Sequence, residues 1–213
     1  MKDYSTYYEN AGLNEKIKRD GYELFELTLQ EGYNSYDISI DGSPFKAVIY
    51  NKYVNKNGSM YYILTHEKLF KKGSVIEWDS GKWLVMSRPE NNSVYDKAEM
   101  QICNSSIDLK GETKQVQVGV GSKTGKPIYE TIESPPLKIP CIAEKTITKS
   151  NTDEAINMPE GTILITIPYV EHEQLDIDKE LVIYDTKYKI IDVDDTESIN
   201  GVGLRRITGN RVV

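Results

Sequence analysis

The chain has 213 residues, a length that fits one large or two small domains with a real hydrophobic core. Its 33 Asp and Glu residues outnumber 26 Lys and Arg residues, for a net charge of −7. This argues against a protein whose whole surface binds the phosphate backbone of nucleic acids. No stretch approaches the roughly 20 apolar residues that cross a bilayer, and the polar N-terminus predicts no signal peptide. We therefore expect no membrane association.

The first segment, residues 1–32, is expected to be helical. Its apolar residues recur at spacings near three and four: Leu13, Ile17, Leu24 and Phe25. Gly32 is a plausible end of the helix. Gly12 and Gly21 disfavour helix, so one long helix and two short ones both fit the pattern.

Short strands follow over residues 33–110, the first predicted β module. Asp41-Gly42 separates the runs Asp37–Ile40 and Phe45–Tyr50, and Asp-Gly between such runs is a strong hairpin signal. Many short strands with closely spaced turns predict a barrel or a sandwich.

Residues 111–136 differ from both neighbouring regions and predict an extended hairpin arm that ends in a proline-rich crossing. Gln115–Val118 alternates strictly, and a glycine-rich tip follows at Gly119–Pro127. A phosphate-binding loop would need glycine where Val120 stands, so we exclude nucleotide binding there. Residues 137–213 then form the second predicted β module. The fold class is thus mainly β, with a short N-terminal helical segment and two small barrel or sandwich modules linked by an extended hairpin.

A strand–turn–strand segment occurs twice, at Val75–Val85 and Leu181–Ile191. Its turns align as Trp78-Asp79-Ser80 and Tyr184-Asp185-Thr186, which indicates two related modules. The second copy replaces both tryptophans with tyrosine and lacks the glycine. A shared ligand is therefore not required, and hairpin geometry explains the polar turn residues.

The residues that could carry chemistry form no recognisable constellation, so we expect no enzyme, no catalytic or metal-binding residues and no cofactor. His66 and His172 have no ligand partner at zinc spacing. The acidic cluster fits either calcium binding or a solvated loop, and the loop is favoured because the cluster lacks the ligand pattern of an EF-hand. That cluster comprises Asp192, Asp194, Asp195 and Glu197. Cys103 and Cys141 are expected to be reduced core thiols, and the Arg205-Arg206 pair is expected to be solvated.

The aromatic residues point to half-buried surfaces, because 15 Tyr and 2 Trp stand against only 3 Phe. Trp78 and Trp83 flank one turn, where core packing and an interface are both open. The hairpin arm is expected to project and to contact other subunits. The candidate interface residues are Trp78, Trp83, Val116, Val118, Gly119, Gly121, Gly125, Pro127 and Tyr129.

From residue 39 onward the chain resembles the neck or head-completion (head-to-tail connector) proteins of tailed bacteriophages. The segments that carry the resemblance are Lys72–Trp78, Lys82–Val85, Ala98–Asn104, Ile139–Ile142, Tyr188–Asp194 and Gly203-Leu204. The resemblance implies a non-enzymatic virion protein that is made in the bacterial host cytoplasm. It implies a homo-oligomeric ring between portal and tail that contacts portal or adaptor and tail proteins. DNA would pass through that ring without sequence-specific binding.

Two alternatives remain beside this structural role. The excess of Tyr and Trp also suits a carbohydrate-binding β module of a phage tail or host-surface protein. A polysaccharide-processing enzyme has only scattered carboxylates in its favour.

Overall fold

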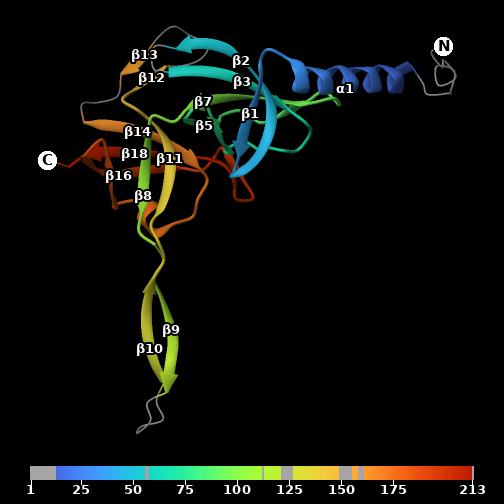
Figure 1. The fold of residues 1–213 in the computed structure, drawn as a ribbon. Coiled ribbons are helices and arrows are strands. Elements are labelled where there is room, and N and C mark those ends of the chain that lie inside the picture. Colours follow the sequence, from blue (N-terminus) through green and yellow to red (C-terminus); the bar gives the residue numbers. More distant parts are fainter. Residues whose placement is uncertain are drawn as a thin grey trace. The chain divides into compact units, whose positions relative to one another are not determined.

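The computed structural model describes residues 13–55, 58–111, 113–120, 127–148, 155–157 and 161–212. The chain divides into two compact units, Met1–Ile102 and Cys103–Val213. The fold is mainly β, with one N-terminal helix and a six-stranded antiparallel barrel in each unit, as the sequence predicted (Figure 1). The first unit ends at Ile102, whereas the sequence analysis ended the first module at residue 110. The difference arises because the strand at Ser105–Leu109 pairs with Leu137–Cys141 of the second unit.

In its described residues the first unit holds one helix and seven strands. These are α1 (Leu13–Glu31), β1 (Ser35–Ile40), β2 (Ser43–Asn55), β3 (Gly58–Thr65), β4 (Val75–Trp78), β5 (Gly81–Val85), β6 (Glu90–Asn91) and β7 (Asp96–Ile102). Six of the strands hydrogen-bond in the order β1-β2-β3-β7-β5-β4, and β4 returns to β1, so the barrel is closed. Closure removes the free edges of an open sheet.

Helix α1 continues through Gly21 as a single helix within the described residues, and it ends where the sequence predicted. The Gly32 N–H donates to the Thr28 carbonyl over 2.9 Å. A Cβ at residue 32 would lie only 2.3 Å from that carbonyl oxygen, so glycine is required. Phe25 and Leu29 are buried against Val48, and this contact fixes the C-terminal half of α1 on the first barrel.

The second unit contains the remaining elements. These are β8 (Ser105–Leu109), β9 (Thr113–Val120), β10 (Pro127–Glu133), β11 (Leu137–Glu144), β12 (Thr146–Thr148), β13 (Ala155–Asn157), β14 (Thr162–Pro168), the 3-10 turn η2 (Glu173–Leu175), β15 (Glu180–Ile183), β16 (Thr186–Asp194), β17 (Ser198–Ile199) and β18 (Val202–Arg211). The barrel order is β8-β11-β14-β18-β16-β15.

The second barrel is nearly closed, because Cα atoms of β15 and β8 approach within 8 Å without forming a ladder. The Tyr184 hydroxyl, just beyond β15, donates to the carbonyl of Asn104, just before β8, over 3.1 Å. A side chain therefore bridges the seam that main-chain hydrogen bonds leave open.

The two barrels share one topology. When the six barrel strands of each unit are numbered along the chain, both follow the order 1-2-3-6-5-4. The short strands β6 and β17 also correspond, since each pairs with strand six of its own barrel. The repeated hairpins, β4–β5 and β15–β16, are strands four and five in both units. The related modules inferred from this repeat are therefore visible in the strand order.

The repeated turns match less closely than their sequences suggest. Asp79 and Ser80 form the two-residue loop of the first copy, with φ of 49° and 59°. In the second copy the loop is Tyr184-Asp185, with φ of 50° and 58°. Both pairs have the positive φ of tight hairpin turns. The loops are offset by one residue, so Trp78 ends a strand whereas Tyr184 occupies a turn.

Each barrel has its own core, built by alternation of buried and exposed side chains along the strands. In the first barrel the core includes Ile40, Ile63, Ile76 and Met100. In the second it includes Ile107, Ile165, Leu175 and Ile207. Because each unit has its own hydrophobic core, the two units are two domains.

Candidate functional site

Strands β9 and β10 form a two-stranded ribbon that leaves the second barrel between β8 and β11 (Figure 1). The predicted arm is thus an extended hairpin, but it lies inside the second unit rather than linking the two modules. Among the described residues neither strand pairs with a third strand. Both outer edges therefore carry main-chain donors and acceptors that can accept another strand.

The ribbon exposes apolar side chains that have no core to enter. Val116, Val118 and Tyr129 are 44%, 54% and 57% exposed. The register shifts between Ile128 and Tyr129, which leaves Val118 without a direct cross-strand partner. An isolated two-stranded hairpin is marginally stable in water, so a ribbon of this kind gains most from being covered.

The base of the ribbon is built to a fixed geometry. A Cβ on Gly111 would lie 1.8 Å from the Ser134 carbonyl oxygen, so only glycine lets the two strands of the ribbon approach this closely at its base. The Lys110 N–H donates to Gln174 Oε1 over 2.6 Å. His172 Nδ1 accepts from the Gln174 N–H over 3.2 Å, so its Nε2 carries the proton and donates to the Lys110 carbonyl over 3.1 Å. The η2 turn thereby holds the start of the ribbon on the barrel.

The structure brings together only part of the predicted interface set. Val116, Val118, Gly119, Pro127 and Tyr129 all lie on the ribbon. Their interface role remains a prediction. Two further candidates, Gly121 and Gly125, lie outside the described residues.

Trp78 and Trp83 belong to an aromatic cluster of the first barrel. Trp83 is only 5% exposed, and its ring lies 5.2 Å from that of Trp78. The Trp83 Nε1–H donates to the Trp78 carbonyl over 3.1 Å. The ring of Tyr61 packs edge-on against both tryptophans. Core packing thus accounts for Trp83, while the half-buried Trp78 keeps some surface.

A shallow depression of about 330 Å³ lies beside Trp78. It is lined by Asp37, Glu77, Trp78, Asp79, Ser80, Gly81 and Lys82. An aromatic edge next to carboxylates and a hydroxyl is the type of surface that a sugar can contact. This depression is the feature on which the carbohydrate-binding alternative depends.

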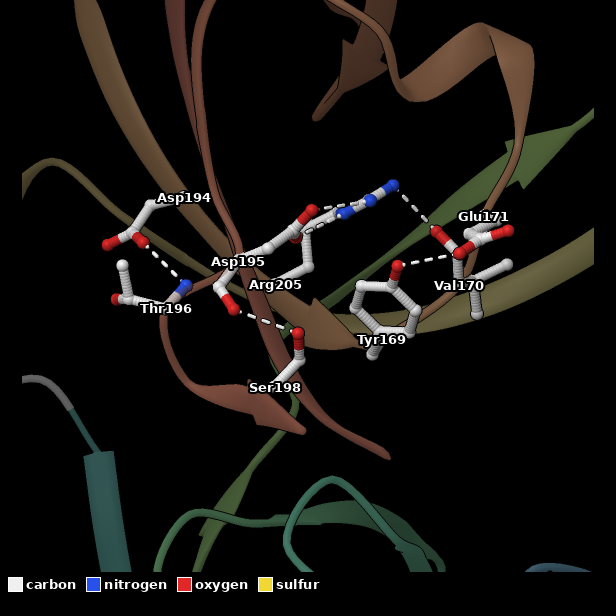
Figure 2. Close-up of polar contacts among 8 residues, drawn as sticks. All are labelled: Tyr169, Val170, Glu171, Asp194, Asp195, Thr196, Ser198 and Arg205. Atoms are coloured by element: carbon white, nitrogen blue, oxygen red, sulfur yellow. Dashed lines mark hydrogen bonds and ion pairs between the residues drawn. The ribbon is translucent and has the colours of Figure 1, made fainter. Parts of the chain in front are cut away.

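The second barrel contains a buried polar latch centred on Arg205 of β18 (Figure 2). Arg205 is 7% exposed, which corrects the expectation of a solvated arginine pair. Its Nε and Nη2 donate to the two carboxylate oxygens of Asp195 over 2.6 and 2.7 Å, and Nη1 donates to the Val170 carbonyl over 2.7 Å. The guanidinium also stacks 4.9 Å from the Tyr169 ring. The bidentate contact with Asp195 raises the pKa of Arg205 further, so the latch stays charged.

The latch supports the β17–β18 hairpin. The Ser198 hydroxyl donates to the Asp195 carbonyl over 2.8 Å, as Figure 2 shows. Gly203, at φ 143°, is held against Glu197, where a Cβ would lie 2.2 Å from the carbonyl oxygen. Ile199 and Val202 at the tip are exposed. These contacts hold the base of the β17–β18 hairpin against the segment that contains Asp195 and Glu197.

Three of the four carboxylates of the acidic cluster, those of Asp194, Asp195 and Glu197, have protein partners. Asp195 binds Arg205, Glu197 pairs with Arg206 at 2.6 Å, and Asp194 accepts from the Thr196 N–H over 2.8 Å. Hydrogen bonding by Thr196 lowers the pKa of Asp194. Within the described ranges no three His, Cys, Asp or Glu side chains are grouped as a metal site. The loop interpretation of this cluster stays a prediction.

Neither Cys103 nor Cys141 is in a disulfide; Cys141 is buried and Cys103 is half-buried. Burial raises the pKa of Cys141 to about 12, so the thiol is protonated at neutral pH. A protonated, buried thiol is a packing group rather than a nucleophile. In the part of the chain that the structure describes, no helix is both long and apolar enough to cross a membrane.

Sequence reasoning missed the groups that hold these features in place. His172 and Gln174 carry no periodic signal, because their role depends on contact with Lys110 more than sixty residues away. The sequence places Arg205 in an arginine pair and Asp195 in an acidic cluster, and shows no link between them. Gly111 offered a usable signal, since glycine and Ser134-Pro135-Pro136 bracket the alternating ribbon strands.

Comparison with solved structures gives one distant likeness. The Klebsiella pneumonia MrkH–c-di-GMP complex matches 92% of this chain and 86% of its own, with 12% identity and a TM-score of 0.23. A superposition of this quality supports no statement about fold or ligand.

Sequence comparison is far more informative. The SPbeta prophage-derived protein YomX of Bacillus subtilis (strain 168) is 35% identical over 214 residues, covering 100% of this chain and 98% of the relative. The YomX N-terminal domain matches residues 7–102, and the YomX C-terminal domain matches residues 99–210. These two matches follow the two barrels. The chain therefore belongs to the YomX family and is a homologue of a prophage-derived protein.

Proposed function

We propose that the chain is a structural protein of a phage particle, without enzymatic activity, that forms a ring in the neck between portal and tail. The anchored ribbon is the observation that carries this proposal. It combines two unpaired edges with exposed apolar side chains on a base held by Gly111, His172 and Gln174. The prophage derivation of the relative supports the same setting.

The ribbon suits contact with further copies of this chain. Its two edges are different, because one belongs to β9 and the other to β10. If β9 of one copy pairs with β10 of the next, the contact is head-to-tail, and a rotation that closes gives a ring. All strands then run antiparallel to their neighbours. Val116 and Val118 lie on one face of the ribbon and Tyr129 on the other, so on each face they would pack beside the side chains of the adjacent arms. Portal or adaptor and tail proteins would bind the two ends of that ring.

The acidic balance of the chain suits passage of DNA through such a ring. Negative walls repel phosphates, so a duplex would slide without being held and without its sequence being recognised. A lumen lined by neutral or basic residues in the assembled particle would contradict this part of the proposal.

The oligomeric state of the purified full chain tests the ribbon directly. We expect native mass spectrometry to detect closed oligomers for the wild type. The double variant Val116→Asp/Val118→Asp should lose them, because charges replace the apolar contact. Val182→Asp is the matched control, since Val182 is 54% exposed but lies on β15. Unchanged assembly of the ribbon variant would contradict the proposal.

A second measurement tests the location. Cryo-electron microscopy of particles released by prophage induction should show the chain between portal and tail. Density elsewhere, or a chain absent from the particle, would contradict the neck assignment.

The carbohydrate-binding alternative rests on the depression beside Trp78. A glycan array would detect sugar binding by this surface. Saturable binding to a cell-wall sugar that Trp78→Ala abolishes would favour this function over the structural one, whereas sugar binding that survives the substitution would not involve this surface.

A further inference from the structure

The contact between η2 and the base of the ribbon depends on the protonation state of one histidine. The Gln174 N–H donates to Nδ1 of His172 over 3.2 Å, so this ring nitrogen carries no proton. Nε2 of the same ring lies 3.1 Å from the Lys110 carbonyl oxygen, which can only accept, so Nε2 donates. Both contacts form together only when the ring is neutral. We call His172, Gln174 and Lys110 the ribbon catch.

A second proton on the ring would break one half of the ribbon catch. Nδ1 would then carry a hydrogen that faces the Gln174 N–H, and two donors repel each other. Gln174 would lose the contact that fixes its backbone, and its Oε1 is the group that accepts from the Lys110 N–H over 2.6 Å. Leu175, the next residue of η2, is fully buried in the barrel core. Protonation therefore loosens the start of the ribbon without requiring the barrel to open.

The surroundings of the ring give acid a route to this histidine. His172 is half-buried, so its ring can exchange protons with water. Carboxylates outnumber basic groups in the adjoining segments, and their negative charge favours a second proton, whereas the Gln174 N–H opposes it. The titratable and charged side chains of those segments are Glu171, Glu173 and Asp176 on the η2 side, Asp108 and Lys110 on the β8 side, and Glu180 on β15, which contacts η2.

We propose that His172 is a pH-sensitive switch of the ribbon. The neutral ring holds the base of the ribbon on the second barrel, and the protonated ring releases Gln174 and frees the start of β9. The switch concerns how the ribbon is mounted and does not depend on what the ribbon binds. One consequence rests on the proposed function: if the ribbon joins copies of this chain, acid weakens their assembly.

Nuclear magnetic resonance of the full chain tests the switch. The Val116→Asp/Val118→Asp background is used so that ribbon contacts between copies do not contribute. The imidazole ¹⁵N signals of His172 should show a proton on Nε2 alone at about pH 7.5 and on both nitrogens at about pH 5. A ring that stays neutral at the lower pH would overturn the proposal.

Amide hydrogen exchange in the same samples measures the release. After correction for the intrinsic exchange rate, protection of the Lys110 and Gln174 amides should fall about tenfold in acid, because opening no longer breaks a hydrogen bond. The Ile165 amide is the reference, since Ile165 is buried on a strand paired on both sides in the same barrel. Constant protection in the ribbon catch, or an equal loss at Ile165, would overturn the proposal.

Two substitutions separate the effect of the proton from that of the side chain. His172→Asn keeps an acceptor that can cap the Gln174 N–H but does not titrate, so protection should be the same at both pH values. His172→Lys has a positive charge and no acceptor, so protection of the Gln174 amide should be low at both. The Ile165 amide shows whether each variant is folded. A pH dependence that persists in His172→Asn would assign the titration to another group and overturn the proposal.

Native mass spectrometry of the chain with its natural ribbon, at the same two pH values, separates the switch from the proposed function. Oligomers that dissociate in acid for the wild type but persist for His172→Asn would support both. If the ribbon catch opens in acid while no oligomer forms at either pH, the switch stands and the ring proposal fails.

Discussion

The two barrels have the same strand order but treat the connection between their first two strands differently. In the first barrel, Asp41-Gly42 joins β1 to β2 in a two-residue turn. In the second barrel, the same connection carries the whole β9–β10 ribbon. A barrel thus accepts a long insertion at this point while its core strands keep their order. The scaffold is repeated, and the variable connection supplies the distinguishing feature.

The barrels also differ in how they are closed. The first returns from β4 to β1 through main-chain pairing, whereas the second leaves a seam between β15 and β8. Tyr184 bridges that seam, and the Arg205 latch ties β18 to Asp195 and Val170. Side-chain contacts thus help to close the second barrel, whereas main-chain hydrogen bonds close the first. Because each barrel also has its own core, substitutions in one barrel should leave the other folded.

The largest expected effect is in the closed barrel. Trp83→Ala removes a buried ring and its hydrogen bond to the Trp78 carbonyl, so we expect a loss of about 4 kcal/mol of stability. Both tryptophans lie in the first unit, so the fluorescence of Trp78 in a urea titration reports this barrel. The second barrel should unfold at its original urea concentration. A shift of both transitions together would show that the two units unfold as one.

The latch gives the next largest effect, confined to the second barrel. Arg205→Met leaves Asp195 and the Val170 carbonyl without their donors, and we expect a loss of about 3 kcal/mol. The neighbouring Arg206→Met is the matched control, since its pair with Glu197 is more exposed and should cost under about 1 kcal/mol. Alkylation of Cys141 in a Cys103→Ser background measures the unfolding. Equal losses for the two arginines would contradict a structural latch.

How far the sequence predicts this molecule depends on the range of the contacts involved. Local signals were sufficient for the Asp41-Gly42 hairpin and the helix end at Gly32, because a turn's backbone geometry selects its residues. The repeat at Trp78 and Tyr184 correctly indicated related modules. Its one-residue offset could not be foreseen, since strand register is fixed by pairing partners elsewhere.

Assignments that needed long-range contacts were less successful. β8 was grouped with the first module because it follows β7 closely, and only its pairing with β11 places it in the second. The acidic balance of the chain predicts a solvated Arg205, and no local pattern reveals its contact with Asp195, ten residues away. Of the candidate site, the ribbon strands were predictable from alternation. The anchor through His172 and Gln174 was not.

A transplant of the short connection tests the comparison with a smaller expected change. Replacing residues 110–136 by Asp-Gly, so that Leu109 and Leu137 flank the turn, would give the second barrel the turn of the first. We expect the stability of the second barrel to change by about 1 kcal/mol or less, because the ribbon lies outside its core and a shorter loop costs less closure entropy. Cys141 alkylation in urea, again with Cys103→Ser, would measure this.

Assembly provides the other half of the transplant experiment. The ribbon-free chain should fail to form closed oligomers, and so should a variant that deletes only Gly119–Pro127. If the ribbon-free chain unfolds in buffer, the ribbon contributes to the stability of the second barrel. If it assembles normally, the ribbon has no role in assembly.

A comparably small expected effect is a pH dependence specific to the second barrel. The folded pKa of Cys141 is raised to about 12, whereas an unfolded thiol titrates near 8.5. Above about pH 8.5 the unfolded state loses this proton while the folded state retains it, so stability falls as pH rises, by at most about 1.4 kcal/mol per pH unit. Urea titrations at pH 7.5 and 9.5, followed by circular dichroism, should show a steeper decline for the wild type than for Cys141→Ala. The first-barrel transition, followed by tryptophan fluorescence, should show no difference between the two proteins. If the stability of the second barrel falls equally with pH in both proteins, the thiol of Cys141 is accessible to water in the folded state.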